Sequence, residues 1–353
     1  MLSPSSNGAA ISPESTLMYQ ESSDATNVVR RQLTENADLL RDAVARIRAF
    51  APRAIVTCAR GSSDHAATYG KYLFETRLGL PTASAAPSVT SVYNVQLQLA
   101  GTLYIAISQS GKSPDLLASV RQAKEAGALT LALVNVEDSP LASLADIVIP
   151  LRAGEEKSVA ATKSWLATLS ATLQLTAAWS GDQALQQAAE DLPAALANAW
   201  QKDWHTAVET LKDARNLFVI GRGIGFGAAL EAALKLKETC GLHAEAFSAA
   251  EVRHGPMAIV NEGFPVIIFS QQDATLASTE SLVEDFVARN AQVLVASEDY
   301  QGKGALPVVA DADAVIAPLL AVQSFYRMAN ALSIARGYNP DQPPHLRKVT
   351  ETV

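Results

Sequence analysis

The chain has 353 residues, which is long for one domain and comfortable for two, and its 48% hydrophobic and 18% charged residues are typical of a folded protein. With 28 Lys and Arg against 36 Asp and Glu, the net charge of −8 disfavours nucleic acid and anionic membranes as partners. Cys58 and Cys240 are too few for a disulfide framework or a metal cluster, and we expect both to be buried. Because neither a signal peptide nor a membrane span is recognisable, we predict a cytoplasmic protein. We also predict that it holds no metal.

The first part of the chain is predicted to be an α/β domain. Residues 1–23 are rich in Ser and Pro and indicate a flexible leader, whereas apolar residues at helical spacing predict an N-terminal helix within residues 24–50. Over residues 51–186, short β-branched runs then alternate with helical stretches, which is typical of a parallel sheet covered by helices. The strands of this domain are predicted at residues 54–58, 103–107, 129–134 and 146–150.

The same plan recurs in a second domain, predicted over residues 214–340 after a helical connector at 187–213. Two of its strands are expected at residues 217–220 and 266–269. Arg60-Gly61 and Arg222-Gly223 each follow a strand, as do Ser108-Gln109 and Ser270-Gln271, and the members of both pairs lie 162 residues apart. Two landmarks at one offset predict a duplicated α/β unit. Residues 341–353 then form a C-terminal tail.

A serine-rich turn, Ser108 to Ser113, follows one strand of the first domain and precedes a helix. Ser113 suits the helix N-cap and Pro114 the first helical position. Hydroxyls, a glycine and backbone N–H groups at a helix N-terminus, beyond the carboxyl end of a strand, favour phosphate binding without an arginine. A well-capped turn without function is the alternative, and the similar turn Gly61-Ser62-Ser63-Asp64 makes it less favoured.

The second domain carries a glycine run, Gly221 to Ala228, that invites comparison with the dinucleotide motif G-x-G-x-x-G. Counted from Gly221 the sixth position is Phe226, and no acidic residue ends a following strand at the expected distance. We therefore expect no nicotinamide and no other cofactor. The counterpart of the serine-rich turn, Ser270 to Asp273, lacks the hydroxyl cluster, so the two copies are expected to differ in role.

Glu231, Lys235 and Glu238 lie at positions i, i+4 and i+7 of a predicted helix and therefore share one face. A solvated salt-bridge face is one interpretation. Proton transfer between adjacent sugar carbons is the other, because it needs a carboxylate and a nearby cation. On their own, His254 reads as a structural histidine and Lys348 as part of a frayed terminus.

Several of these segments together resemble the isomerase half of glucosamine-6-phosphate synthase, in order and spacing, over roughly residues 25–353. They are Ser108-Gln109-Ser110-Gly111, residues 156–163, residues 229–238, His243-Ala244-Glu245, His254-Gly255-Pro256, and Asp341-Gln342-Pro343 with Lys348. The resemblance implies two tandem sugar-isomerase (SIS) domains, each with a flavodoxin-like parallel sheet. It also implies a substrate site made of Ser62, Ser63, Ser108, Gln109, Ser110, Ser113, Glu156 and Val159.

The resemblance further implies four catalytic residues in a homodimer with shared active sites. Glu238 would move a proton between C1 and C2 beside Lys235, and His254 would open the amino-sugar ring from the other subunit. Lys348 would open the ketose ring through a Schiff base, which requires a deprotonated lysine, as burial favours. Two departures stand out: Lys112-Ser113 replaces the family's acidic-Thr pair, and Ala161 replaces a serine that contacts substrate.

The synthase also carries a glutamine-hydrolysing domain with a cysteine directly after the initiator methionine, whereas Leu2 follows Met1 here. The sequence thus resembles the second class of glucosamine-6-phosphate deaminases, which form fructose 6-phosphate and ammonia. Synthesis with free ammonia and deglycation of a fructosamine 6-phosphate stay open. A non-catalytic sensor of hexose or hexosamine 6-phosphates is a further alternative, although it has no use for Glu238, His254 and Lys348 together.

Overall fold

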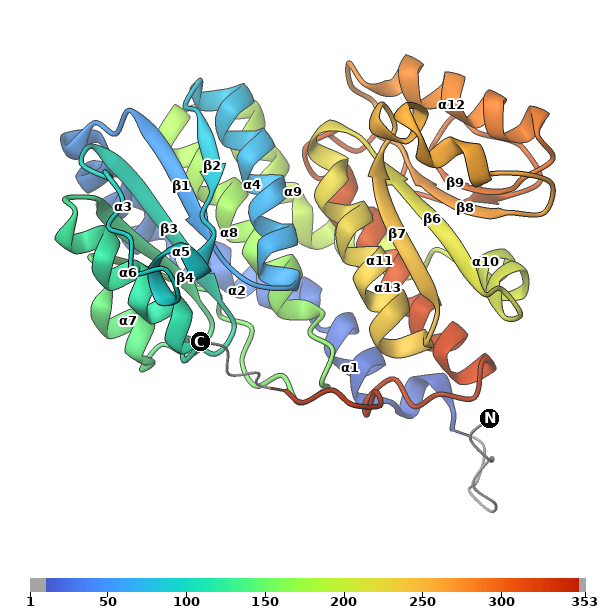
Figure 1. The fold of residues 1–353 in the computed structure, drawn as a ribbon, viewed down its shortest axis with the longest axis horizontal. Coiled ribbons are helices and arrows are strands. Elements are labelled where there is room, and N and C mark those ends of the chain that lie inside the picture. The colour runs from blue at the N-terminus through green and yellow to red at the C-terminus, as the bar shows by residue number, and fades with distance from the viewer. Residues whose placement is uncertain (1–10, 349–353) are drawn as a thin grey trace.

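Two five-stranded parallel sheets form the frame of the computed structural model, which describes residues 11–348. The strand order is β2-β1-β3-β4-β5 in the first sheet and β10-β9-β8-β6-β7 in the second. Figure 1 shows the first sheet on the left, the second on the right, and helices between them. The predicted fold, two tandem flavodoxin-like α/β domains, is confirmed.

The first sheet is covered by helices on both faces, so its central strands are apolar along almost their whole length. Its strands are β1 (Ala54–Cys58), β2 (Thr82–Ser84), β3 (Thr102–Ser108), β4 (Leu129–Val134) and β5 (Ile147–Pro150). One face packs against α3 (Ala37–Phe50), α4 (Ser62–Leu78) and α8 (Lys163–Ser180), and the other against α6 (Pro114–Glu125) and α7 (Pro140–Leu144), with α5 (Pro87–Ser91) packed on α6. The four predicted strands are all present, and the short edge strand β2 was not predicted.

The second sheet has the same layered arrangement. Its strands are β6 (Asn216–Gly221), β7 (His243–Ser248), β8 (Pro265–Phe269), β9 (Gln292–Ala296) and β10 (Ala305–Leu306). One face packs against α11 (Phe226–Cys240) and α13 (Ala317–Ala335), with α10 (His205–Leu211) beside them. The other face packs against α12 (Leu276–Ala288) and the short 3-10 helices η3 (Glu251–His254) and η4 (Pro256–Ile259). A further 3-10 turn, η2 (Gly223–Gly225), joins β6 to α11.

The two domains share one hydrophobic core, in which α4 and α8 meet α11 and α13. The contact between α4 and α11 is close: a Cβ on Gly227 would lie 2.7 Å from the carbonyl oxygen of His65. Only glycine fits there, which explains part of the glycine run. The predicted connector is α9 (Gln183–Trp200) followed by α10, and α9 packs into the shared core against α8 and α13.

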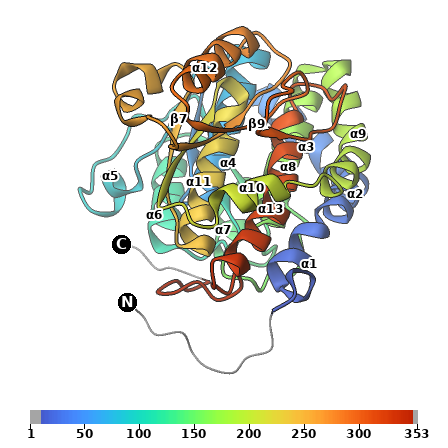
Figure 2. The same cartoon turned by 90° about the vertical axis from the view of Figure 1, so that its right-hand side faces the viewer.

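The N-terminal region differs from the prediction. In place of a flexible leader and one long helix, residues 11–50 form η1 (Pro13–Ser15), α1 (Leu17–Ser23), α2 (Ala25–Glu35) and α3. Met18 and Ser22 are fully buried, so α1 is part of the fold, and it lies beside α13 (Figure 2). Asn36 separates α2 from α3 because its side chain donates a hydrogen bond to the carbonyl of Pro150, 2.8 Å away. Residues 1–10 and 349–353 lie outside the described residues.

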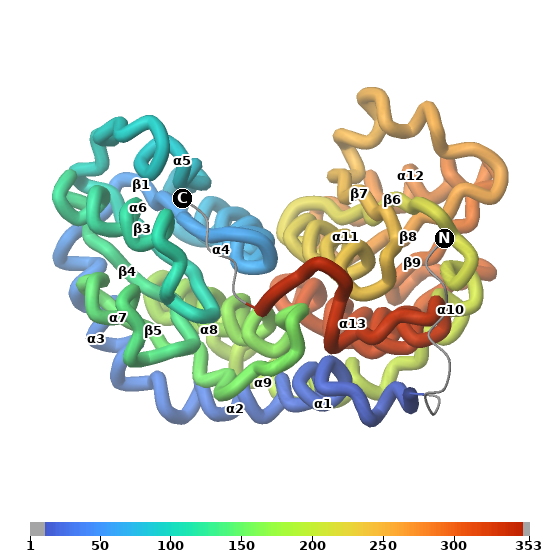
Figure 3. Tube along the Cα trace, turned by 60° about the horizontal axis from the view of Figure 1, so that its bottom comes forward, coloured from blue at the N-terminus to red at the C-terminus, as the bar shows by residue number. Residues whose placement is uncertain are grey.

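The chain after α13 runs from the second domain toward the first one, as the red segment of Figure 3 shows. Asp341 fixes this segment to α1, because its two carboxylate oxygens accept the backbone N–H groups of Leu17 and Met18, each at 2.8 Å. This carboxylate therefore caps the N-terminus of α1. Within residues 11–348, none of the helices has the length and apolar character of a membrane span.

Candidate active site

A pocket of about 350 Å³ lies at the carboxyl ends of β1 and β3, next to α11 of the second domain. The chain leaves β1 toward one edge of the sheet and β3 toward the other, so the pocket is at the topological switch point where open α/β sheets bind ligands. Its lining residues are Arg60, Gly61, Ser62, Ser63, Ile107, Ser108, Gln109, Ser110, Ser113, Leu116, Val159, Ala161, Lys235, Glu238, Leu346, Arg347 and Lys348.

Two helix N-termini meet at this pocket, since α4 starts at Ser62 and α6 starts directly after Ser113. The turn before α6 is tight: Gly111 has a φ of +64°, and a Cβ there would lie 2.2 Å from the Ser139 hydroxyl. Ser113 is the N-cap residue, as predicted, but its hydroxyl makes no capping bond and lines the pocket instead. Hydroxyl groups and two helix dipoles therefore make this wall suitable for a phosphate.

An arginine also lines this wall, although the phosphate site is predicted to need none. Arg60 donates from Nε and Nη2 to Oδ2 of Asp115, at 2.9 and 2.7 Å. The Asp115 carboxylate is fully buried in the first turn of α6, while the Arg60 side chain is half exposed. The pair places a guanidinium beside the predicted phosphate loops and neutralises a carboxylate that would oppose an anion.

On the opposite wall, the predicted face of α11 is buried, so a solvated salt-bridge face is the wrong interpretation. Lys235 is 1% exposed and contacts Glu238, and its Nζ lies 3.4 Å from Glu231 and 3.0 Å from the Ser62 hydroxyl. Burial alone would lower the pKa of Lys235, but Glu231 and Glu238 outweigh burial and raise it. Lys235 is therefore a cation at neutral pH, held directly beside the Glu238 carboxylate.

Glu231 holds the Lys235 ammonium in place from behind the pocket. Its carboxylate accepts hydrogen bonds from Ser62 at 3.2 Å and Tyr326 at 3.0 Å, and lies 3.2 Å from Nδ1 of His65. Burial would raise the pKa of Glu231, but Lys235, followed by His65 and Ser62, lowers it overall. Tyr326 comes from α13 and His65 from α4, and neither stood out in the sequence because no local pattern connects these helices.

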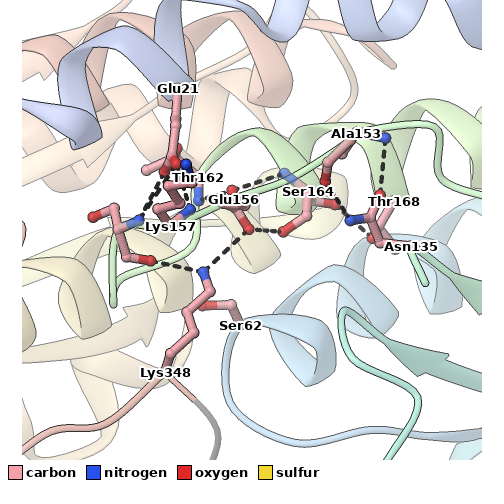
Figure 4. A network of polar contacts seen from close by, with 12 residues as sticks. Glu21, Ser62, Asn135, Ala153, Glu156, Lys157, Thr162, Ser164, Thr168 and Lys348 are labelled. Carbon is pink, nitrogen blue, oxygen red and sulfur yellow. Dashed lines mark hydrogen bonds and ion pairs between the residues drawn. The ribbon is translucent and has the colours of Figure 1, made fainter. Parts of the chain in front are cut away.

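The C-terminal tail supplies Lys348 on a third side of the pocket (Figure 4). Its Nζ donates to the carbonyl of Ser158 at 2.7 Å and lies 3.6 Å from a carboxylate oxygen of Glu156. Glu156, predicted to contact substrate, is buried and not among the lining residues, and it accepts hydrogen bonds from Thr162 N at 2.9 Å and the Ser164 hydroxyl at 2.6 Å. It supports the loop from which Val159 reaches the pocket.

His254 is the one predicted catalytic residue that the fold does not bring to this pocket. It lies on η3 with an exposed side chain and is not among the lining residues. Its predicted contribution to the site of a second subunit stays a prediction. Among residues 11–348, no group of three or more His, Cys, Asp and Glu side chains is placed to hold a metal ion.

Comparison with known proteins relates this chain to proteins named for their action on phosphosugars. The sequence profile of the SIS domain matches residues 50–178 and 210–300. The isomerizing glutamine–fructose-6-phosphate aminotransferase of Methanothermobacter thermautotrophicus is 35% identical over 339 residues, which cover 94% of this chain and 56% of that enzyme. The chain thus spans about half the length of the curated relatives it matches.

Two solved structures have the same architecture. A candidate phosphosugar isomerase from Silicibacter pomeroyi is 42% identical, with a TM-score of 0.88 over 92% of this chain and 100% of that one. The C-terminal domain of glucosamine-fructose-6-phosphate aminotransferase from Francisella tularensis is 25% identical, with a TM-score of 0.81 over 93% and 97% of the two chains. The predicted resemblance to the isomerase half of the synthase is confirmed.

Proposed function

The chain belongs to the SIS domain family, and we propose that it is a phosphosugar isomerase that converts glucosamine 6-phosphate into fructose 6-phosphate and ammonia. One observation carries the proposal: the anion-binding loops of the first domain and the Lys235–Glu238 pair of the second line a single pocket. A phosphate held at Ser108–Ser113 would place the sugar chain across the pocket toward α11. The carboxylate would then act on carbons at the far end of the sugar.

Glu238 is the proposed acid–base residue. In the open-chain aldose it takes the proton from C2, which leaves an enol carrying the amine on C2, and it then returns the proton to C1. The product is a C2 imine, which water hydrolyses to the C2 ketone and ammonia. Lys235 stays protonated and stabilises the negative charge that develops on oxygen during the transfer.

Ring opening is assigned to two further residues. We propose that Lys348 opens the cyclic ketose through a Schiff base, in keeping with its place on the pocket wall. We also propose a homodimer in which His254 opens the amino-sugar ring at the partner's site, because in one chain its side chain faces solvent away from the pocket.

Hydrolysis of glutamine by a cysteine of this chain is disfavoured by the state of Cys58 and Cys240. Cys58 and Cys240 are buried free thiols, and burial raises the pKa of each to about 11. Neither is a thiolate at neutral pH, so neither is able to attack glutamine. Two free thiols also fit the reducing cytoplasm, where we place the protein.

The test is an assay of ammonia and fructose 6-phosphate formed from a panel of hexosamine 6-phosphates and fructosamine 6-phosphates. We expect turnover of glucosamine 6-phosphate, and a loss of about 10²- to 10⁴-fold in Glu238→Gln, which keeps the shape of the side chain but not its basicity. Exchange of the C2 hydrogen with deuterated water should fall in parallel. Turnover of fructosamines alone would identify a deglycase, and binding without turnover a sensor, and either result would overturn the proposal.

A further inference from the structure

Glu21 of α1 is a buried carboxylate outside the pocket that contacts the loop on which Lys348 rests. It is 8% exposed, and its two oxygens accept the backbone N–H groups of Lys157 and Ser158, the latter at 3.1 Å. Figure 4 shows these contacts on one side of the loop and Lys348 on the other. An N-terminal helix that was expected to be a leader thus reaches the wall of the site.

Ser158 connects Glu21, on one side of the loop, with Lys348 on the other. Its N–H is held by Glu21, while its carbonyl oxygen accepts the hydrogen bond from Lys348 at 2.7 Å. The Lys348 Nζ also lies 3.6 Å from a carboxylate oxygen of Glu156, which is fixed by Thr162 and Ser164. Glu21 fixes the orientation of two successive backbone N–H groups in this loop. The direction of the Ser158 carbonyl therefore depends on Glu21, and so does the position of the Lys348 amine.

The other end of α1 holds the tail that carries Lys348. Asp341 caps Leu17 and Met18, so the tail and the 156–158 loop are both attached to the same short helix. Burial raises the pKa of Glu21 overall, while the hydrogen bonds from Lys157 and Ser158 lower it and Lys348 lowers it by a smaller amount, so Glu21 and Lys348 also interact electrostatically. A change in α1 would displace the amine and its acceptor together.

We infer that Glu21 is a positioning residue for Lys348, and that α1 sets the geometry at which this amine attacks the ketose. The inference rests on the proposed function, because it assigns Lys348 to Schiff-base formation. In that step Lys348, in its deprotonated form, adds to the C2 carbonyl, a C–N bond forms, and the carbonyl oxygen leaves as water with the two protons of the amine. Loss of Glu21 would leave two N–H groups without their acceptor, and the loop would relax to find new partners.

The test is trapping of the Schiff base with borohydride in the presence of fructose 6-phosphate, with mass spectrometry at Lys348, on the full chain. We expect Glu21→Ala to trap about 10- to 100-fold more slowly than wild type, the range of effects that a small misplacement of a reacting group produces. Glu21→Gln retains one acceptor oxygen and should show an intermediate loss. Gln20→Ala, an exposed neighbour on α1, is the matched control and should trap at the wild-type rate.

A second readout separates positioning from general damage. Exchange of the C2 hydrogen of the amino sugar depends on Glu238, which Glu21 does not contact, so it should change by less than about twofold in Glu21→Gln. If both Glu21 variants are trapped at the Gln20→Ala rate, the inference is overturned and the proposed function stands. The same conclusion follows if trapping and exchange fall by equal factors. If wild type forms no adduct at Lys348, the proposed role of that lysine fails, and the inference fails with it.

Discussion

Lys235→Met tests whether the buried charges of α11 hold one another in place. The substitution removes the cation from a cluster in which Lys235 is 1% and Glu231 0% exposed. Breaking a buried ion pair typically costs about 3–5 kcal/mol, because the remaining charge is left without its partner. We expect the lower end, about 3 kcal/mol, since Glu231 keeps hydrogen bonds from Ser62 and Tyr326, each worth about 1.5–3 kcal/mol.

The assay is equilibrium unfolding in urea, followed by circular dichroism, for the two single variants and for Glu231→Gln with Lys235→Met. Removing both buried charges leaves only the partly exposed Glu238 carboxylate without its partner, so the double variant should be about 2 kcal/mol more stable than the sum of the single losses predicts. Lys237→Met is the control, because Lys237 lies on the same helix with an exposed side chain and should change stability by less than about 0.5 kcal/mol. A Lys235→Met loss no larger than the control, or strict additivity, would refute the reasoning.

The pH dependence of the same variants checks the sign of the interaction. The pKa of Glu231 is lowered from its ordinary value of 4.5, so its contribution to stability is present above that value and is lost as the pH falls through the folded-state pKa. The pKa of Lys235 is raised from 10.5, so its contribution is present below that value and is lost as the pH rises through the folded-state pKa. Glu231→Gln should therefore flatten the acid limb of the stability curve, and an unchanged limb would contradict the assignment.

Two further predictions concern binding and assembly. Ser110→Ala should weaken phosphate binding by about 1–3 kcal/mol, measured by calorimetry with fructose 6-phosphate, whereas Ser270→Ala at the equivalent turn should not, and equal losses would place the anion in both domains. Mixing inactive His254→Ala with inactive Glu238→Gln should restore about a quarter of wild-type activity, because each heterodimer keeps one intact site. Subunit exchange without recovered activity would exclude shared sites.

The predicted parts of the fold are those with a local signal. Strands such as Ala54–Cys58 are recognisable from β-branched runs, and the phosphate loops from serines that follow such strands. The two-residue strand Ala305–Leu306 has too few residues to show a period, so it was not predicted. The helix Leu17–Ser23 was not predicted because its buried face is made of Met18, Glu21 and Ser22, and two of these are polar residues.

The predicted parts of the candidate site are likewise those with a local signal in the sequence. Glu238 and Lys235 follow from helical spacing on one element, but the partners of Glu231 come from α4 and α13, which only the tertiary structure brings together. Glu21 shows the limit most clearly, since its acceptor role depends on backbone groups 136 and 137 residues away. A contact at that separation leaves no periodicity in a single sequence.

The second copy of the α/β unit accounts for why one pocket is assembled from two different domains. At its switch point the Gln271 side chain, 5% exposed, donates to the carbonyl of Arg222 at 2.9 Å and to the Thr275 hydroxyl at 3.0 Å. Its amide oxygen lies so near Gly225 that a Cβ there would come within 2.6 Å of it. The crevice that we propose to bind an anion in the first copy is thus occupied by the Gln271 side chain in the second. Because Gly227 lets α11 approach α4 closely, the second copy instead contributes a charged helix face to the first copy's pocket, and the proposed division between phosphate binding and acid–base chemistry follows from that packing.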